Sequence, residues 1–279
     1  MIYSTLQNSQ FIYETRKNVF GTVLCKSIVL AVCLMIATAS YSATAFADNF
    51  TDAFTCKSTI SQENYSKLLA NVTNASEKTT SLTATFSQTS YFLGLDKIEA
   101  STGRVSFQKV AKMRWDYLTP TKQLFIMDGE NVWFYQPEQN QAIVTDFYNS
   151  FKSDVPVSFL LGLGKLSETF DVQSACNTSA GILLTLVLKK SDDSLDKFYL
   201  LVRKSDYAPI GVKIIDLGGN ETSILFNNLQ LNTKINASEF TFVPPKGADI
   251  IDNRSAMPTL KRNAGQNIGQ GTVREEDIL

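Results

Sequence analysis

The nucleophilic and titratable side chains of this 279-residue chain show no recognisable catalytic spacing. The sequence contains no histidine, which excludes Ser–His and Cys–His nucleophiles, histidine-containing zinc sites and the commonest general base near neutral pH. The stretch Gly-Leu-Gly-Lys at 162–165 lacks the earlier glycine and the following Ser or Thr of a phosphate-binding loop. Ser–Lys pairs, paired carboxylates and carboxylate-only metal sites remain possible in principle, but the sequence forms no catalytic constellation. We therefore expect no enzyme, no cofactor and no metal site, with an exported hydrolase as a disfavoured alternative.

The first 47 residues have the pattern of a secretory signal peptide. Basic residues at 16, 17 and 26 precede the apolar run 27–35, and a segment rich in small residues then ends in Ala45-Phe46-Ala47. The apolar run is shorter than the ~20 residues of a membrane span, although an N-terminal membrane anchor remains the alternative. The whole chain has a net charge of −1, which predicts no nucleic-acid partner.

Two cysteines, Cys56 and Cys176, follow the predicted signal peptide. In an exported protein they could form a disulfide that ties the N-terminal segment to the middle of the chain, and two unpaired thiols are the alternative. Lipid attachment at Cys33 would require a small residue directly before it. The bulky Val32 makes a lipid anchor there a poor match.

The pattern of apolar residues predicts one helix followed by an antiparallel meander. Ser61 is a candidate N-cap for a helix over 61–76, and a period of two begins at Ser81. Strands are predicted within 81–87, 104–108, 112–120, 123–127, 132–135, 142–145, 170–173, 182–189, 197–203, 209–217 and 222–229, with a final extended piece at 240–243. We take 48–253 as one β-rich domain and 254–279 as a flexible polar tail.

The stretch KMRWDYLTP at 112–120 raises the question of function. Met113, Trp115 and Tyr117 alternate with charged residues, so the strand should have one apolar face and one charged face exposed to water. Either this apolar face is an ordinary core covered by helices, or it lines a cavity for a lipid-like ligand. Methionine and aromatic rings slightly favour the cavity, whose predicted lining is Phe86, Val105, Phe107, Met113, Trp115, Trp133 or Phe134, Phe198 and Ile214.

The predicted meander is interrupted at 150–169. Phe159, Leu160 and Leu163 suit a short apolar helix, and Gly162 and Gly164 suit its end. In the cavity interpretation this helix is a movable lid that competes with the ligand for the same apolar surface.

Several segments together resemble the outer-membrane lipoprotein carrier family, LolA. They are LTATFSQT at 82–89, GRVSFQKVAKMRWDYLTP at 103–120, DGENVWFYQPEQNQ at 128–141, VPVSFLLG at 155–162 and FTFVPPKGADIID at 240–252. The resemblance implies an open, incomplete antiparallel β half-barrel with a helical lid. It also implies a monomeric periplasmic chaperone that takes lipoproteins from an inner-membrane transporter, shields their acyl chains and passes them to an outer-membrane receptor.

The resemblance also implies roles for individual residues. Met113 and Trp115 match the family's ligand-handling and cavity positions. Lys109 occupies the place of a basic residue, usually arginine followed by proline, that holds the lid closed; here lysine followed by Val110 departs from that pattern. Two alternatives share a similar fold: the lipid-anchored outer-membrane lipoprotein receptor and a lipid-binding envelope sensor domain.

Overall fold

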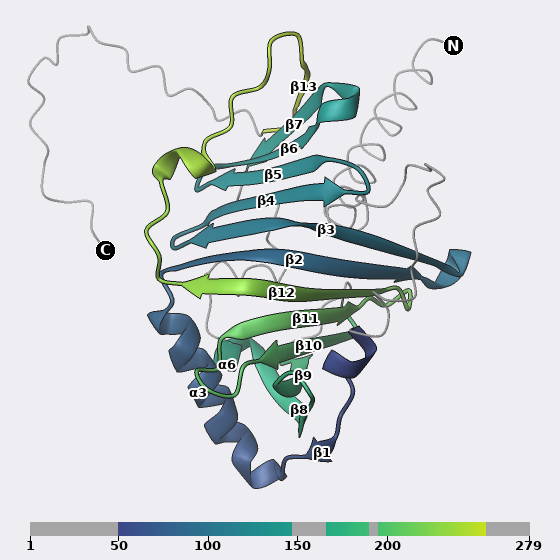
Figure 1. Ribbon diagram of the computed structural model, residues 1–279, viewed down its shortest axis with the longest axis vertical. Coiled ribbons are helices and arrows are strands. Elements are labelled where there is room, and N and C mark those ends of the chain that lie inside the picture. Colours follow the sequence, from purple (N-terminus) through teal and green to yellow (C-terminus); the bar gives the residue numbers. More distant parts are fainter. Residues whose placement is uncertain (1–49, 147–165, 190–194, 255–279) are drawn as a thin grey trace, which may run out of the picture.

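The computed structural model describes residues 50–146, 166–189 and 195–254, and these form one open sheet with a few helices (Figure 1). The order of its strands is β1-β8-β9-β10-β11-β12-β2-β3-β4-β5-β6-β7-β13. Neighbouring strands in this order are antiparallel except β7 and β13, which are parallel. The predicted mainly β fold, an open antiparallel half-barrel, is therefore confirmed.

The strands follow the predicted order along the chain. Their bounds are β1 Ser58–Thr59, β2 Ser81–Phe92, β3 Lys97–Gln108, β4 Lys112–Thr119, β5 Gln123–Asp128, β6 Asn131–Gln136, β7 Gln141–Asp146, β8 Phe170–Asn177, β9 Ile182–Leu188, β10 Lys197–Val202, β11 Pro209–Ile215, β12 Glu221–Leu231 and β13 Asp249–Asp252. The helices are η2 Gln62–Asn64, α3 Tyr65–Lys78, η3 Leu93–Leu95, η4 Pro137–Gln139, α6 Leu166–Thr169 and η5 Ala237–Phe240.

Three predicted features lie outside the described residues: the signal peptide over 1–47, the apolar helix with Phe159, Leu160 and Leu163, and the tail after Arg254. The prediction of an extended piece at 240–243 is wrong at its start, because Phe240 ends the 3-10 helix η5. The short strands β1 and β13 were not predicted. Both are edge strands whose residues are exposed, so neither carries an alternating apolar pattern.

Alternate side chains divide the sheet into two faces, which we call the inner and outer faces. The inner face carries one apolar cluster with members from β8 and β9 at one end of the strand order and from β5 and β6 near the other. Phe170 on β8 and Phe198 on β10 lie within it, with ring centroids 5.4 Å apart. A single cluster that spans so many strands requires the sheet to curve around it.

Helix α3 packs against the inner face beside β8 and α6. It descends at the lower left of Figure 1, at a steep angle to β10, β11 and β12, and its buried residues are Leu68, Val72 and Thr73. The predicted N-cap Ser61 precedes the 3-10 turn η2, and its side chain caps no backbone amide. None of the described helices is long and apolar enough to cross a membrane.

The N-terminal segment covers one end of the outer face. Ala53 packs with Cys176, Leu183 and Leu201 in a second apolar cluster. A disulfide joins Cys56 to Cys176, with the Cα atoms 5.6 Å apart. The predicted pairing is thus present in the structure, and it fixes this segment beside β8, where β1 adds two further strand residues.

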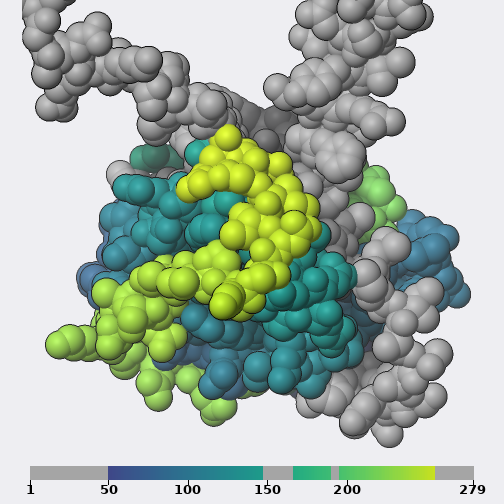
Figure 2. Space-filling view, turned by 90° about the horizontal axis from the view of Figure 1, so that it is seen from above, coloured from purple at the N-terminus to yellow at the C-terminus, as the bar shows by residue number. Residues whose placement is uncertain are grey.

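The C-terminal segment covers the other end of the outer face. Figure 2 shows residues near 240 (yellow-green) lying across the strands coloured teal. Phe240 is 1% exposed, and Phe242 lies against Trp133 and Tyr135, with ring centroids 5.3 Å from each. Ile126, whose side chain belongs to this face of β5, is completely buried.

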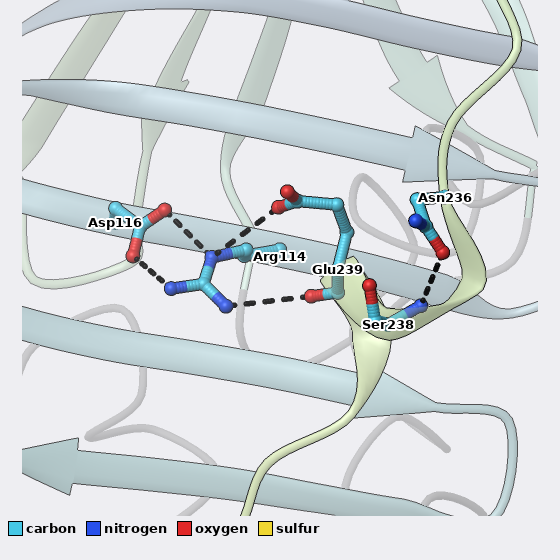
Figure 3. Close-up of polar contacts among 5 residues, drawn as sticks. All are labelled: Arg114, Asp116, Asn236, Ser238 and Glu239. Atoms are coloured by element: carbon cyan, nitrogen blue, oxygen red, sulfur yellow. Dashed lines mark hydrogen bonds and ion pairs between the residues drawn. The ribbon is translucent and has the colours of Figure 1, made fainter.

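Polar contacts hold the C-terminal segment on β4 (Figure 3). Arg114 donates two hydrogen bonds to Asp116, at 2.8 and 2.9 Å, and a longer one of 3.4 Å to the carbonyl oxygen of Glu239. The hydrogen bonds to Asp116 raise the pKa of Arg114. The expectation that this charged face of β4 is simply exposed to water is therefore wrong, because the chain's own C-terminal segment shields it.

Candidate functional site

The structure brings the predicted cavity residues together on the inner face. Phe86, Val105, Phe107, Met113 and Phe198 are buried members of the main apolar cluster, and Trp115 and Ile214 pack against it. All residues of this cluster are uncharged. The sequence alone did not decide whether Trp133 or Phe134 belongs to the cavity lining. The structure places Phe134 in the cluster, whereas Trp133 packs on the outer face.

Strand register explains why these residues meet. Val105 lies opposite Trp115, which in turn lies opposite Phe125. Phe107 is paired in the same way with Met113, and Met113 with Met127. Because directly opposed residues in an antiparallel pair point to the same face, β3, β4 and β5 form continuous apolar rows across the sheet.

An aromatic group occupies the centre of the inner face. The ring of Trp115 lies 4.8 Å from that of Phe86, 6.0 Å from Phe107 and 6.2 Å from Phe226, measured between centroids. Phe86 also meets Tyr117 edge-on at 5.1 Å. Such tilted and edge-to-face contacts are favourable for aromatic pairs.

Gly103 makes room for this group. It pairs with Phe86 across β2 and β3. A β-carbon at position 103 would lie only 2.6 Å from Cε1 of Phe86 and 1.9 Å from the carbonyl oxygen of Asp116. The ring of Phe86 therefore rests on a bare stretch of backbone, which only glycine allows.

Several members of the cluster were not among the predicted site residues, and those nearest the aromatic group and Met113 include Tyr117, Phe125, Met127 and Phe226. Tyr117 shares the parity of Met113 and Trp115, and Phe125 and Met127 alternate along one short strand. Periodicity could therefore have identified these three. Phe226 pairs with Phe86 across β12 and β2, and this long-range contact has no local signal.

A small cavity lies between the C-terminal end of α3 and the inner face. Its lining includes Val72 and Ser76 on α3, Leu82 on β2, Phe107 on β3 and Phe226 on β12. The volume is about 40 Å³, enough for a few water-sized groups and too small for an acyl chain. In the described arrangement this cavity alone therefore cannot hold an acyl chain.

Lys109 lies at the rim of this cavity. Its ammonium donates hydrogen bonds of 2.7 and 3.1 Å to the carbonyl oxygens of Ser76 and Glu77, in the last turn of α3. The last carbonyls of a helix lack partners within the helix, and a cation there is favoured. Lys109 therefore donates hydrogen bonds to the backbone of a helix, but this helix is α3 and not the predicted lid. Its predicted contact with 155–163 lies outside the described residues and stays a prediction.

Nothing at the site suggests metal binding. Within residues 50–146, 166–189 and 195–254, no group of three or more Cys, Asp or Glu side chains is placed to hold a metal ion. The inner face offers apolar area, aromatic rings and uncharged hydrogen-bonding groups. These features suit the binding of an apolar molecule.

Comparison with known proteins identifies the family. The family model for the outer membrane lipoprotein carrier protein LolA matches residues 77–243, which is more than half of the chain. The chain belongs to the LolA family. The match begins at the end of α3 and includes β2 to β12, so all the predicted inner-face residues and Lys109 lie within it.

Bacterial LolA relatives align over most of their own length. An outer-membrane lipoprotein carrier protein of Pseudomonas syringae pv. syringae is 33% identical over 187 residues, covering 67% of this chain and 88% of the relative. One from Methylobacillus flagellatus is 32% identical over 156 residues, covering 56% and 75%. The crystal structure of a LolA superfamily protein from Nitrosomonas europaea is 10% identical, with a TM-score of 0.37, and covers 64% and 97%.

Proposed function

We propose that this LolA family member is a carrier that shields the acyl chains of lipoproteins on the inner face of its sheet. The observation that carries the proposal is the apolar cluster on the inner face, centred on Phe86, Met113 and Trp115, in a chain that relatives named as outer-membrane lipoprotein carriers match over most of their length. Its place of action is the periplasm. Its partners are acylated lipoproteins, the inner-membrane transporter that releases them and the outer-membrane receptor that accepts them.

The energetics suit a carrier of this kind. Each methylene group of an acyl chain that leaves water contributes about 0.8 kcal/mol. Several long chains therefore supply a large driving force without a precisely fitted pocket. Methionine and aromatic side chains provide large apolar area that tolerates different chain positions, which allows both binding and release.

Uptake requires the covered inner face to open. The 40 Å³ cavity under α3 cannot admit an acyl chain, so an element that covers the face must move. Among the described elements, α3 borders the cavity and is attached to the sheet there by Lys109. We therefore assign α3 and Lys109 to the covering part of the site, with the ligand replacing apolar contacts that α3 makes in the empty protein.

A binding assay tests the proposal. Purified protein is mixed with liposomes that contain a synthetic acylated cysteinyl peptide, and the soluble fraction is analysed for a protein–lipopeptide complex. We expect wild-type protein to extract the peptide. Failure to extract it under conditions where the protein is folded would overturn the proposal.

Variants on β4 locate the binding face. Met113→Glu places a charge among buried apolar groups and should abolish extraction, and Met113→Gln should weaken it at a smaller cost in stability. Leu118→Glu on the same strand is the matched control, because Leu118 is 41% exposed and should tolerate the charge. Each value is corrected for the folded fraction. Wild-type extraction by folded Met113→Glu would place the ligand elsewhere.

A further inference from the structure

The inner face is not apolar along its whole length. Along β2 its residues are apolar up to Phe86 and then become Gln88 and Ser90. Along β5 they change from Phe125 to Gln123, and along β12 from Ile224 to Thr222. Ser101 pairs with Gln88, and Tyr117 pairs with Gln123. We call Gln88, Ser90, Ser101, Tyr117, Gln123 and Thr222 the polar band.

The register places the polar band directly beside the aromatic group. Gly103 pairs with both Phe86 and Tyr117. The inner-face residues of β2, β3, β4 and β5 therefore change from apolar to polar at the same height in the sheet, to within about one residue pair. The band carries hydroxyl and amide groups, which are uncharged at neutral pH. The next inner-face residue on β3, Glu99, is charged and forms a salt bridge with Lys97 of the same strand, with 2.6 Å between Oε1 and Nζ.

Hydrogen bonds link part of the polar band into a chain. The Tyr117 hydroxyl donates to Oε1 of Gln88 at 3.0 Å, and Nε2 of Gln88 donates to Oγ of Ser90 at 3.1 Å. Oγ of Ser90 lies 3.3 Å from Oγ1 of Thr222. These contacts hold Gln88, which is 5% exposed, and Ser90, which is 3% exposed, in fixed positions.

Two buried polar atoms at the band lack partners among the described residues. They are Oε1 of Gln123 and the indole Nε1 of Trp115. Gln123 is only 8% exposed, and Trp115 stacks beside Tyr117 with ring centroids 6.3 Å apart. A buried polar group without a partner costs about 1–3 kcal/mol. Such a cost points to a ligand that supplies the missing hydrogen bonds.

We propose that the polar band binds the ester and amide groups that join the acyl chains to the lipoprotein's N-terminal cysteine. This inference rests on the proposed function and deepens it. Ester carbonyls accept hydrogen bonds and carry no charge, which suits the indole N–H of Trp115. Oε1 of Gln123 is itself an acceptor, so at this residue the side-chain amide turns to present its Nε2 donor to the ester carbonyl. From Gln88 to Leu82 the strand runs about 20 Å, so a long acyl chain anchored at the band can lie along the apolar part of the inner face.

The test compares two synthetic cysteinyl lipopeptides with chains of equal length, one joined by glyceryl esters and one by ethers. We expect wild-type protein to bind the ester form about tenfold more tightly, the effect of one or two net hydrogen bonds. Gln123→Met should lower ester affinity to the ether level and leave ether affinity unchanged. Its stability should be unchanged or higher, because the substitution removes a buried amide whose oxygen has no partner.

Tyr117→Phe is a second test of the polar band, because it removes the hydroxyl group and keeps the ring. We expect this variant to show a smaller preference for the ester. Gln230→Met on the exposed outer face of β12 is the matched control and should bind both peptides as wild type does. Equal wild-type affinity for the two linkages, or equal weakening of both by Gln123→Met, would overturn the role of the band while the carrier function stands. Failure of wild-type protein to bind either peptide would instead overturn the carrier function.

Discussion

The two faces of the sheet are covered in different ways. Segments from both ends of the described chain cover the outer face, through the Cys56–Cys176 disulfide and the contacts of Arg114 with Glu239. On the inner face, α3 packs over part of the apolar cluster, and its C-terminal end is held by two hydrogen bonds from Lys109. Two buried polar atoms of this face, on β4 and β5, lack partners among the described residues. We therefore expect the outer face to stay covered, and we propose that the inner face is the one that exchanges its own contacts for those of a ligand.

The largest effect should come from removing the main apolar anchor of the outer face. Phe240 is 1% exposed, and Phe240→Ala should lower the free energy of unfolding by about 3–5 kcal/mol. Urea denaturation measures the change. Lipopeptide affinity per folded molecule should remain that of wild type. A strong loss of affinity in the folded variant would show that the two faces are not independent.

Breaking the disulfide should have the next largest effect. Cys56 and Cys176 are 120 residues apart in the sequence, and removing a native disulfide typically costs about 2–5 kcal/mol. We expect Cys56→Ser to unfold at lower urea concentration than oxidised wild type and at the same concentration as reduced wild type. An unchanged midpoint would mean that the outer-face cover does not depend on this bond.

A smaller, local effect is expected at the inner face. Lys109→Met removes both hydrogen bonds to the end of α3, and we expect about 1 kcal/mol of lost protection there. Hydrogen exchange should show faster exchange in α3, with the central strands unaffected. Lys109→Arg should restore protection. If Lys109→Met destabilised the whole sheet equally, α3 would be as firmly fixed as the outer-face segments.

The smallest effect concerns the exposed end of the outer-face segment. Hydrogen bonds from Arg254 lower the pKa of Asp252 from 3.8 to about 2. A lowered carboxylate pKa means that any stabilisation is present above pH 3.8 and is lost as the pH falls through about 2. An NMR titration should show Asp252 ionising near pH 2 in wild type and closer to 3.8 in Arg254→Gln. Equal values in both would exclude this pairing in solution.

Periodicity alone predicted most of the sheet and most of the site. Met113, Trp115 and Tyr117 alternate with charged residues, and this pattern indicates a strand with one apolar face wherever it occurs. Local pattern determines the strands and their two faces because a strand's side chains alternate whatever it packs against. The half-barrel, which the structure confirms, was implied by the resemblance of the motifs between 82 and 252 to the LolA family.

The tertiary structure decided which surfaces are covered and by what. Arg114 and Asp116 have the sequence pattern of an exposed face, yet residues more than a hundred positions later lie across them. The contact of Phe226 with Trp115, the choice of Phe134 over Trp133 and the gathering of the polar band depend on register between distant strands. A sequence shows each strand's two faces, but only long-range packing determines what each face meets.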